Sequence, residues 1–295
     1  MRERQIINCI AVFTAGDGSE RGGLMKFAFS TLGCPDWSWE EILATAKDMG
    51  YDAVEIRGIS KEIYAPAIPV FAPDRINEVR QKLGRMGLSL SCLTSACYLF
   101  DKDNIDKTLA EGKEYISLAA ALGVPFIRVL GDRDPQPGGS IDDGFVAEAL
   151  KQLCEFARNT DVTVLIETNG VFAESARLLQ LVESVDDPKL GVLWDIHHPY
   201  RYFAETPEYT YGLLKKYIRY LHVKDSVMTE EGKLKYRMMG YGDVPVTGAL
   251  KILKADGFNG FVTLEWVKRW YSELEEPGVV FMQYISYMRR LIRRL

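Results

Sequence analysis

An eightfold alternation of short apolar runs with longer amphipathic segments constrains this chain more than any other feature. The runs are rich in β-branched and aromatic residues, which favour strands. Strands are expected at residues 26–30, 53–55, 88–93, 125–130, 162–166, 190–194, 218–223 and 261–265. Parallel strands need a crossover helix between them, so strict alternation predicts a parallel sheet. Eight such units favour a closed barrel, and we expect a single α/β domain with the (β/α)8 fold.

The segments between the runs carry signals for helix starts and stops. Ser38 precedes Glu40 and Glu41, which gives an N-cap with acids in the first turn, and Gly50 ends that segment. Helices are expected at residues 39–49, 74–86, 105–122, 142–158, 174–185, 207–216, 247–255 and 277–295. No GxGxxG sequence follows the first strand, which argues against a dinucleotide-binding sheet.

The chain divides at Met25, directly before the first expected strand. Residues 1–24 are interpreted as a flexible N-terminal extension or the product of a misplaced start, and residues 25–295 as the catalytic barrel domain. A short apolar stretch at residues 6–15 resembles a signal peptide, but it is weak and Glu3 precedes it. No linker or low-complexity segment follows Met25.

Composition excludes several classes of partner. The formal net charge of -5 and the absence of basic runs argue against nucleic acid. No apolar run approaches the ~20 residues that span a bilayer, so no membrane partner is expected. Five cysteines, an odd number without a CxxC pair, indicate free thiols in a reducing compartment. The expected location is therefore the cytoplasm.

Acidic and imidazole side chains close four consecutive expected strands: Glu167, Asp195, His222 and Glu265. The active sites of such barrels lie at the C-terminal ends of the strands. Each residue alone is compatible with a local hydrogen bond at a strand end. Three carboxylates behind buried runs would repel one another, and a divalent ion removes that conflict. We therefore expect a metal site, and its ligand set suits Mn²⁺, Mg²⁺, Co²⁺ or Zn²⁺.

The histidines strengthen this expectation. The chain has three, His197, His198 and His222, and all fall at the predicted rim. Asp195 and His198 are three residues apart, so one helical turn directs both into the site. His198 is then a candidate substrate contact, whereas His197 is expected to face away.

The residues resemble the xylose isomerase-like TIM-barrel superfamily, which contains sugar phosphate isomerases and epimerases. The resemblance runs from about Met25 to the C-terminus. It is carried by segments 27–31 (FAFST), 50–55 (GYDAVE), 165–167 (LIE), 195–198 (DIHH), 222–225 (HVKD), 257–260 (GFNG) and 264–265 (LE). The order Glu, Asp, His, Glu is the most specific of these features. The AP endonucleases of the superfamily use histidines from early strands, and this chain has none before position 197.

The ketose 3-epimerase branch implies a role for each matching residue. Its four ligands bind one Mn²⁺-like ion, and its two glutamates exchange protons with the substrate. Carried over, Glu167 and Glu265 become the catalytic acid/base pair, while Asp195 and His222 are ligands only. The matching Asp-x-x-His spacing implies that His198 contacts a substrate oxygen.

Four further residues are candidate substrate contacts. Lys224 and Arg128 are cations at strand ends, suited to a carboxylate or hydroxyls of the substrate. Trp266 is a candidate wall for a sugar ring. Glu55 closes the second strand, where it joins the polar network or pairs with Arg57. For each, a solvated or packing role is the competing interpretation.

The expected function is therefore metal-dependent isomerisation or epimerisation of a ketosugar, by proton abstraction next to a carbonyl through an enediolate. Segment 222–225 looks closer to the inosose dehydratase and isomerase branches, so dehydration of a keto-cyclitol or ketosugar is the alternative. A barrel that binds sugar without catalysis is the third interpretation, and it predicts loss of a ligand, which is not seen. A small carbohydrate is the expected partner. The helix at 277–295 is expected to pack on the barrel, with a homo-oligomer interface as the alternative.

Overall fold

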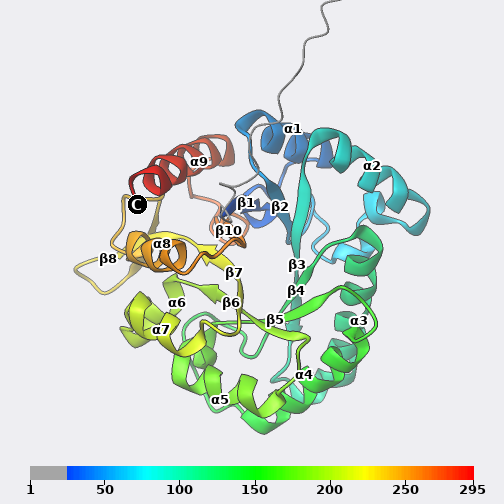
Figure 1. The fold of residues 1–295 in the computed structure, drawn as a ribbon, viewed down its shortest axis with the longest axis vertical. Helices are drawn as coiled ribbons and strands as arrows, with labels where there is room; N and C mark the ends of the chain where they lie inside the picture. The colour runs from blue at the N-terminus through cyan, green and yellow to red at the C-terminus, as the bar shows by residue number, and fades with distance from the viewer. Residues whose placement is uncertain (1–24) are drawn as a thin grey trace, which may run out of the picture.

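The computed structural model describes residues 25–295, so the predicted N-terminal extension lies outside the described residues. Eight parallel strands form a closed barrel in the order β1-β10-β7-β6-β5-β4-β3-β2. Figure 1 views this barrel nearly end on, with the helices in an outer ring around it. Strand β1 closes the barrel by pairing with β10, Lys26 opposite Phe261 and Phe29 opposite Leu264. The (β/α)8 fold predicted from the alternation is confirmed.

The barrel strands begin close to the predicted positions. They are β1 Lys26–Ser30, β2 Ala53–Ile56, β3 Ser89–Tyr98, β4 Phe126–Leu130, β5 Thr163–Glu167, β6 Leu190–Asp195, β7 Ile218–Val223 and β10 Phe261–Leu264. Strand β3 is the longest, and it continues five residues beyond the predicted end. Its pairing with β4 shifts register between Thr94 and Tyr98. A register shift of this kind depends on the neighbouring strand, so the apolar run of β3 alone did not indicate it.

The described α-helices are α1 Trp39–Met49, α2 Ile76–Met86, α3 Ile105–Leu122, α4 Asp143–Ala157, α5 Ser175–Val185, α6 His197–Phe203, α7 Pro207–Leu214, α8 Val246–Ala255 and α9 Pro277–Arg294. Eight of the described α-helices match the predicted segments to within two residues at each end, whereas α6 was not predicted as a separate helix. Ser38 and Glu41 form a full capping box at the start of α1. Gly50 ends that helix with φ +74°, a left-handed conformation that costs a glycine little.

One hairpin was not predicted. Strands β8 (Asp225–Met228) and β9 (Leu234–Arg237) pair antiparallel directly after β7, at the C-terminal end of the barrel. The Asp225 carboxylate accepts backbone N–H groups of Gly240 and Gly242 at 2.8 and 2.9 Å. A Cβ at Gly242 would lie 2.0 Å from Asp225 Oδ1, so this close approach requires glycine. Asp225 therefore anchors the segment that follows the hairpin.

Residues two apart along each strand share the barrel interior, and this periodicity separates apolar from charged layers. The lower interior holds Ala28, Ala53, Cys92, Leu165, Leu193, Tyr220 and Phe261. Two residues further along β5, β6 and β7, the same face carries Glu167, Asp195 and His222, all buried. The charged groups therefore rest directly on an apolar floor.

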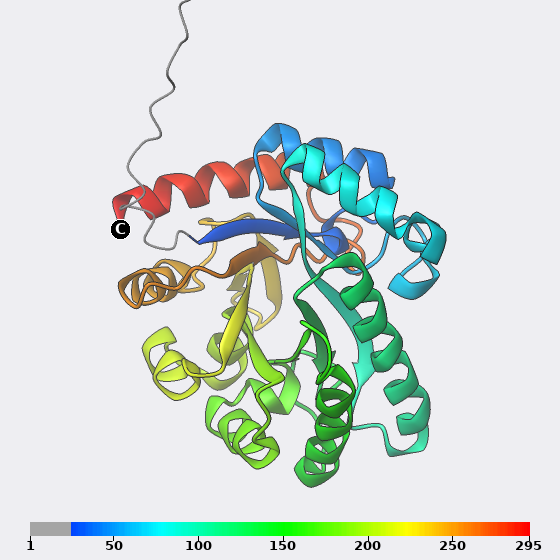
Figure 2. The ribbon, with the colours of Figure 1, turned by 45° about the vertical axis from the view of Figure 1, so that its right-hand side comes forward.

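Helix α9 packs one face on the barrel, as its spacing predicted. Phe281 stacks on Phe29 with ring centroids 4.2 Å apart. The hydroxyl of Tyr284 donates a hydrogen bond to the carbonyl oxygen of Val262 at 2.8 Å. Figure 2 shows the helix lying alongside β1. An oligomer interface on the outer face of α9 stays a prediction.

No helix among the described residues is long and apolar enough to cross a membrane. Cys34, Cys92, Cys97 and Cys154 are buried and free of disulfides. Burial raises the pKa of Cys154 to about 12, so this thiol stays protonated at neutral pH.

The first prediction concerns the apolar floor. The Tyr220 hydroxyl lies 2.7 Å from Ser91 Oγ and 2.6 Å from Thr263 Oγ1. It therefore links strand β7 to strands β3 and β10 across the barrel interior. Tyr220→Phe removes the central hydroxyl and leaves two buried hydroxyls without that partner. The free energy of unfolding should fall by about 1–3 kcal/mol, measured by urea denaturation. The half-exposed Tyr209 provides the matched control, and Tyr209→Phe should leave stability unchanged. An unchanged value for Tyr220→Phe would contradict this account.

Candidate metal centre and substrate cavity

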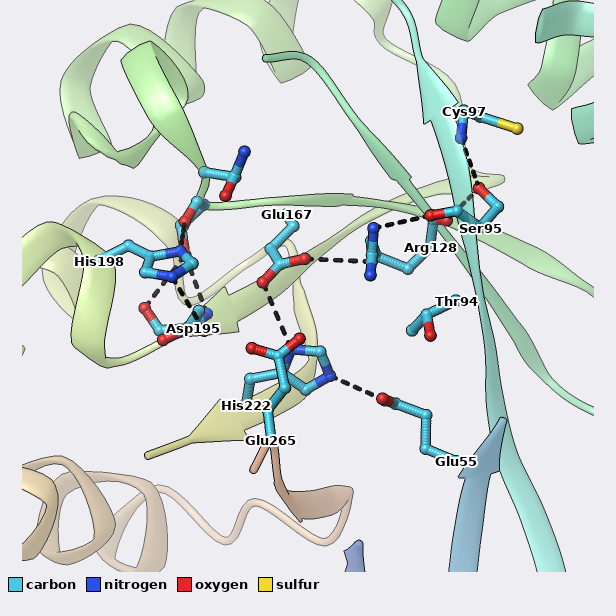
Figure 3. Close-up of polar contacts among 12 residues, drawn as sticks. Glu55, Thr94, Ser95, Cys97, Arg128, Glu167, Asp195, His198, His222 and Glu265 are labelled. Carbon is cyan, nitrogen blue, oxygen red and sulfur yellow. Dashed lines mark hydrogen bonds and ion pairs between the residues drawn. The ribbon is translucent and has the colours of Figure 1, made fainter. Parts of the chain in front are cut away.

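Four side chains converge at the C-terminal mouth of the barrel. Glu167 ends β5, Asp195 ends β6, His222 lies in β7 and Glu265 follows β10 directly. One ligand atom from each lies within 4.8 Å of the others, and all four residues are buried. The backbone N–H of Glu265 still donates to Val223 O at 3.0 Å, so its main chain is held by the neighbouring strand. Figure 3 shows Glu167, His222 and Glu265 turned toward one another.

The orientation of His222 is set by Glu55. His222 Nε2 lies 2.8 Å from Glu55 Oε2, below the cluster on the β2 side. Its Nδ1 faces Glu167 Oε1 at 3.3 Å and Glu265 Oε1 at 3.4 Å. A carboxylate that accepts one ring N–H leaves the other ring nitrogen free as a ligand, an arrangement common around protein-bound metals. Burial lowers the pKa of His222, but Glu55 and Glu265 outweigh it and hold that pKa well above its ordinary value.

Two cations hold the remaining carboxylate oxygens. Arg128 Nε lies 3.1 Å from Glu167 Oε2, and Lys224 Nζ hydrogen-bonds both Asp195 Oδ2 and Glu265 Oε2. Each glutamate therefore turns one oxygen toward His222 and the other toward a cation. Burial raises the pKa of Glu265, but Lys224 and His222 together leave it well below its usual range. For Glu167, burial is likewise outweighed by Arg128 and His222, which lower the pKa.

The donor set fits a divalent cation. Three carboxylates and one imidazole lie within 4.8 Å of one another, and the imidazole is oriented by a further carboxylate. Mixed oxygen and nitrogen ligation of this kind suits Mn²⁺, Mg²⁺, Co²⁺ or Zn²⁺. Because a carboxylate has two oxygens, Glu265 can bind an ion through Oε1 while Oε2 stays with Lys224. Glu167, Asp195, His222 and Glu265 are therefore the residues that could hold such an ion.

The two remaining histidines differ in exposure to the site. His198 Nδ1 lies 2.9 Å from the carbonyl oxygen of Thr168, which can only accept, so Nδ1 carries the proton. Its Nε2 is a bare acceptor without a hydrogen-bond partner among the described residues, 3.5 Å from Asp195 Oδ2. His198 lines the cavity, whereas His197 bonds Ser226 Oγ at 2.9 Å and does not. The structure therefore places only His198 where a substrate could reach it.

A cavity of about 440 Å³ lies over this cluster. Glu167 and Glu265 line it, but Asp195 and His222 do not. The candidate substrate contacts Arg128, Lys224 and His198 also line it. The rest of the wall consists of Leu32, Arg57, Tyr98, Leu130, Arg133, Asp134, Pro135, Asn169, Tyr236, Val267, Trp270 and Tyr271. A substrate in the cavity could therefore touch Glu167 and Glu265, whereas Asp195 and His222 lie beneath the cavity wall.

The structure does not bring two of the proposed substrate contacts to the cavity. Trp266 is buried, and its Nε1 donates to Glu275 O at 3.1 Å. It follows the inward-facing Glu265, so strand alternation turns its ring outward. Glu55 lies below the cluster and holds His222 instead of reaching the substrate space or pairing with Arg57.

The aromatic wall comes from residues that the strand pattern did not single out: Tyr98, Tyr236, Trp270 and Tyr271. Tyr236 lies in the unpredicted hairpin, and Tyr98 lies at the extended end of β3. The available signal for Trp270 is the aromatic and basic composition of segment 266–270 (WVKRW), which directly follows the eighth expected strand but does not show which way the ring points.

The contact of Lys224 with two ligand candidates generates a prediction about metal affinity. Its buried ammonium opposes a second cation nearby, and Lys224→Met removes that repulsion while leaving Asp195 and Glu265 in place. Divalent metal should bind about tenfold more tightly or better, measured by calorimetry with Mn²⁺. The exposed Lys235 of β9 gives the control, since Lys235→Met should not change affinity. Weaker binding in Lys224→Met would contradict the assigned ligand set.

The hydrogen bond from His222 to Glu55 predicts that a substitution of Glu55 weakens metal binding. Glu55→Gln keeps an oxygen acceptor but loses the charge that orients and strengthens the imidazole as a ligand. Mn²⁺ affinity should fall roughly 10- to 100-fold, the usual effect of losing such a support. Glu183→Gln, on the exposed face of α5, is the matched control. Equal affinities for Glu55→Gln and the control would show that Glu55 does not support the site.

Comparison with known proteins finds relatives over most of the chain and the same fold in solved structures. The fructoselysine 3-epimerase of Shigella flexneri is 23% identical over 281 residues, which cover 91% of this chain and 98% of that protein. The probable 3-DHS dehydratase AsbF of Bacillus anthracis shares the fold with a TM-score of 0.74 at 15% identity, covering 90% of this chain and 99% of that one. A xylose isomerase-like TIM barrel protein of Mycobacterium smegmatis, in complex with magnesium, has a TM-score of 0.70 at 17% identity, covering 90% and 96%.

The family assignment rests on most of the chain. The family model described as xylose isomerase-like TIM barrel matches residues 43–290, which span the barrel from α1 to α9. The matched segment contains all four converging ligand candidates. This chain therefore belongs to the xylose isomerase-like TIM barrel family, whose members include sugar isomerases and epimerases.

Proposed function

We propose that this protein is a metal-dependent epimerase or isomerase of a ketosugar, in which Glu167 and Glu265 exchange protons with the substrate. One observation carries the proposal. Of the four converging ligand candidates, only these two glutamates line the cavity, and they come from β5 and from the end of β10. Two carboxylates at the wall of one substrate cavity are the groups that an acid/base reaction needs.

The reaction begins with removal of a proton from the carbon next to a carbonyl, which is too weakly acidic for an unaided carboxylate. A bound divalent ion supplies a Lewis acid that polarises this carbonyl and stabilises the developing negative charge. Arg128 and Lys224 lower the pKa of Glu167 and Glu265 respectively, so each is ionised at neutral pH and able to accept a proton. Epimerisation then requires that one glutamate takes the proton and the other returns one to the opposite face.

The remaining cavity residues position the sugar. The bare Nε2 of His198 accepts a hydrogen bond from a substrate hydroxyl. The cavity volume of about 440 Å³ falls within the ~300–1,000 Å³ that small-molecule sites usually occupy. The similarity to fructoselysine 3-epimerase supports a ketosugar substrate, and the magnesium complex of the Mycobacterium smegmatis protein supports a divalent ion. We propose Mn²⁺ as the resident ion, with Mg²⁺, Co²⁺ and Zn²⁺ compatible with the same donors.

We propose the cytoplasm as the working compartment, because the four described cysteines are buried free thiols and disulfides are rare there.

Dehydration of a keto-cyclitol or ketosugar is the second candidate. It starts with the same proton abstraction, but a hydroxyl on the adjacent carbon then leaves as water and needs a proton. In this candidate the glutamate that takes the proton gives it to the leaving hydroxyl, and the ammonium of Lys224, which lines the cavity and hydrogen-bonds Glu265, donates a hydrogen bond to that hydroxyl. The fold similarity to the probable 3-DHS dehydratase AsbF supports keeping this candidate.

Proton exchange in heavy water tests the proposal. The Mn²⁺-loaded protein is incubated with D-fructose, D-tagatose, D-psicose and inososes, and deuterium incorporation is followed by NMR. Deuterium in a recovered ketose together with its epimer or isomer is the expected result. Loss of water from the substrate would support dehydration instead. Substrate binding without exchange across the panel would contradict catalysis and favour a sugar-binding barrel.

The two glutamates provide the matching variants. Glu167→Gln and Glu265→Gln should each lower the exchange rate roughly 10²- to 10⁴-fold, the usual contribution of a general acid or base. Metal content is measured in parallel, so that loss of the ion is distinguished from loss of the proton carrier. Glu183→Gln should exchange at the wild-type rate. Retained exchange in either site variant, with metal bound, would remove that residue from the acid/base pair.

A further inference from the structure

Arg57 lies in the cavity wall, and no acidic residue in the described part of the chain pairs with it. It follows β2 by one residue, two positions beyond Glu55, and only 6% of it is exposed. Its guanidinium donates one hydrogen bond, to Ile63 O at 3.3 Å. No carboxylate of residues 25–295 forms an ion pair with it. Burial and the nearby Arg128 both lower the pKa of Arg57.

An arginine in this position is costly. The guanidinium stays charged in proteins, and a buried charge is expected to be paired. The same cavity shows that the fold can meet this requirement, because Arg128 lies 3.1 Å from Glu167 Oε2. The absence of an equivalent acid beside Arg57 in the described chain indicates that its counter-anion comes from a ligand.

A second arginine lines the same wall. Arg133 is exposed, and its guanidinium carbon lies 5.9 Å from the ring centroid of Tyr98. Tyr98 lines the cavity together with Arg57 and Arg133. Asp134 lines the cavity as well, but it forms no ion pair with either arginine within residues 25–295.

The space around Arg57 leaves room for a substituent. The Arg57 guanidinium carbon lies 5.9 Å from the ring centroid of Trp270, another residue of the cavity wall. Arg57 also lines a neighbouring cavity of about 480 Å³, formed mainly against α3, but Glu111 and Glu114 line that cavity and disfavour an anion there. An anionic group that reaches Arg57 is therefore expected on the side of the substrate cavity, beside Trp270.

We propose that Arg57, assisted by Arg133, forms an anion subsite that binds a carboxylate or phosphate group carried by the ketosugar. This inference rests on the proposed function, because it takes the sugar itself to occupy the cavity over Glu167 and Glu265. A guanidinium recognises both anions through paired N–H donors. The substrate class is thus an acidic or phosphorylated ketosugar instead of a neutral one.

Calorimetry with matched ketoses tests the subsite. D-fructose, D-fructuronate, D-fructose 6-phosphate and D-fructose 1-phosphate are titrated into the Mn²⁺-loaded protein. At least one charged sugar should bind roughly 10- to 100-fold more tightly than D-fructose, as expected for charged hydrogen bonds. A preference for D-fructuronate indicates a carboxylate subsite, and a preference for either phosphate ester indicates a phosphate subsite.

The variants assign the preference to the subsite. Arg57→Gln should reduce this preference to less than about threefold, and Mn²⁺ content is measured in parallel to show that the metal centre is intact. Arg133 is exposed, so Arg133→Gln is not expected to disturb folding, and it should reduce the preference for the charged sugar by a smaller factor. The control Arg80→Gln on α2 should leave that preference unchanged. No preference in the wild type, no measurable binding of the charged sugars, or a preference that both cavity variants retain would overturn the subsite.

Failure of the two proposals can be told apart. Preferential binding of a charged sugar without deuterium exchange in heavy water would contradict the epimerase function and leave the anion subsite supported. Deuterium exchange on neutral ketoses, with no preference for binding charged sugars, would support the epimerase function and contradict the anion subsite.

Discussion

The two-residue periodicity of a closed parallel barrel is the constraint on which the rest of this structure depends. Alternate residues of every strand point into one interior, so an apolar floor and a charged layer follow each other along the same strands. Strand β7 shows both layers: Tyr220 is hydrogen-bonded within the apolar floor, and His222, two residues further on, lies in the charged cluster. Charges from distant parts of the chain therefore meet where water is largely excluded.

Charge balance then determines what the site can do. Glu167 and Glu265 each have one oxygen near His222 and one near a cation, and Glu55 holds the far side of His222. Burial would otherwise favour protonated carboxylates, but Arg128 and Lys224 keep them ionised. Arg57 departs from this pairing, and the absence of an acidic partner for it among residues 25–295 is the basis for proposing an anionic substrate.

Much of this arrangement was predictable from the chain. The eight strands, the main helices and the convergence of Glu167, Asp195, His222 and Glu265 follow from periodicity and position at strand ends. The direction of Asp225 was not predictable in the same way. Asp225 begins the hairpin strand β8, and its carboxylate turns to the backbone N–H groups of Gly240 and Gly242. The hairpin β8-β9, with Tyr236 in the cavity wall, depends on turns and on loop glycines that hydrophobic periodicity does not register.

The sequence by itself determined the fold class and which four residues are candidate metal ligands, because burial of apolar faces and the position of sites at strand ends follow from local patterns. Only the tertiary structure decided which of these candidates reach the cavity, that Glu55 contacts His222, and that no acid among residues 25–295 pairs with Arg57. These features depend on distances between side chains from different strands. Strand tilt, register and loop closure set those distances, and no local pattern in the chain encodes them directly.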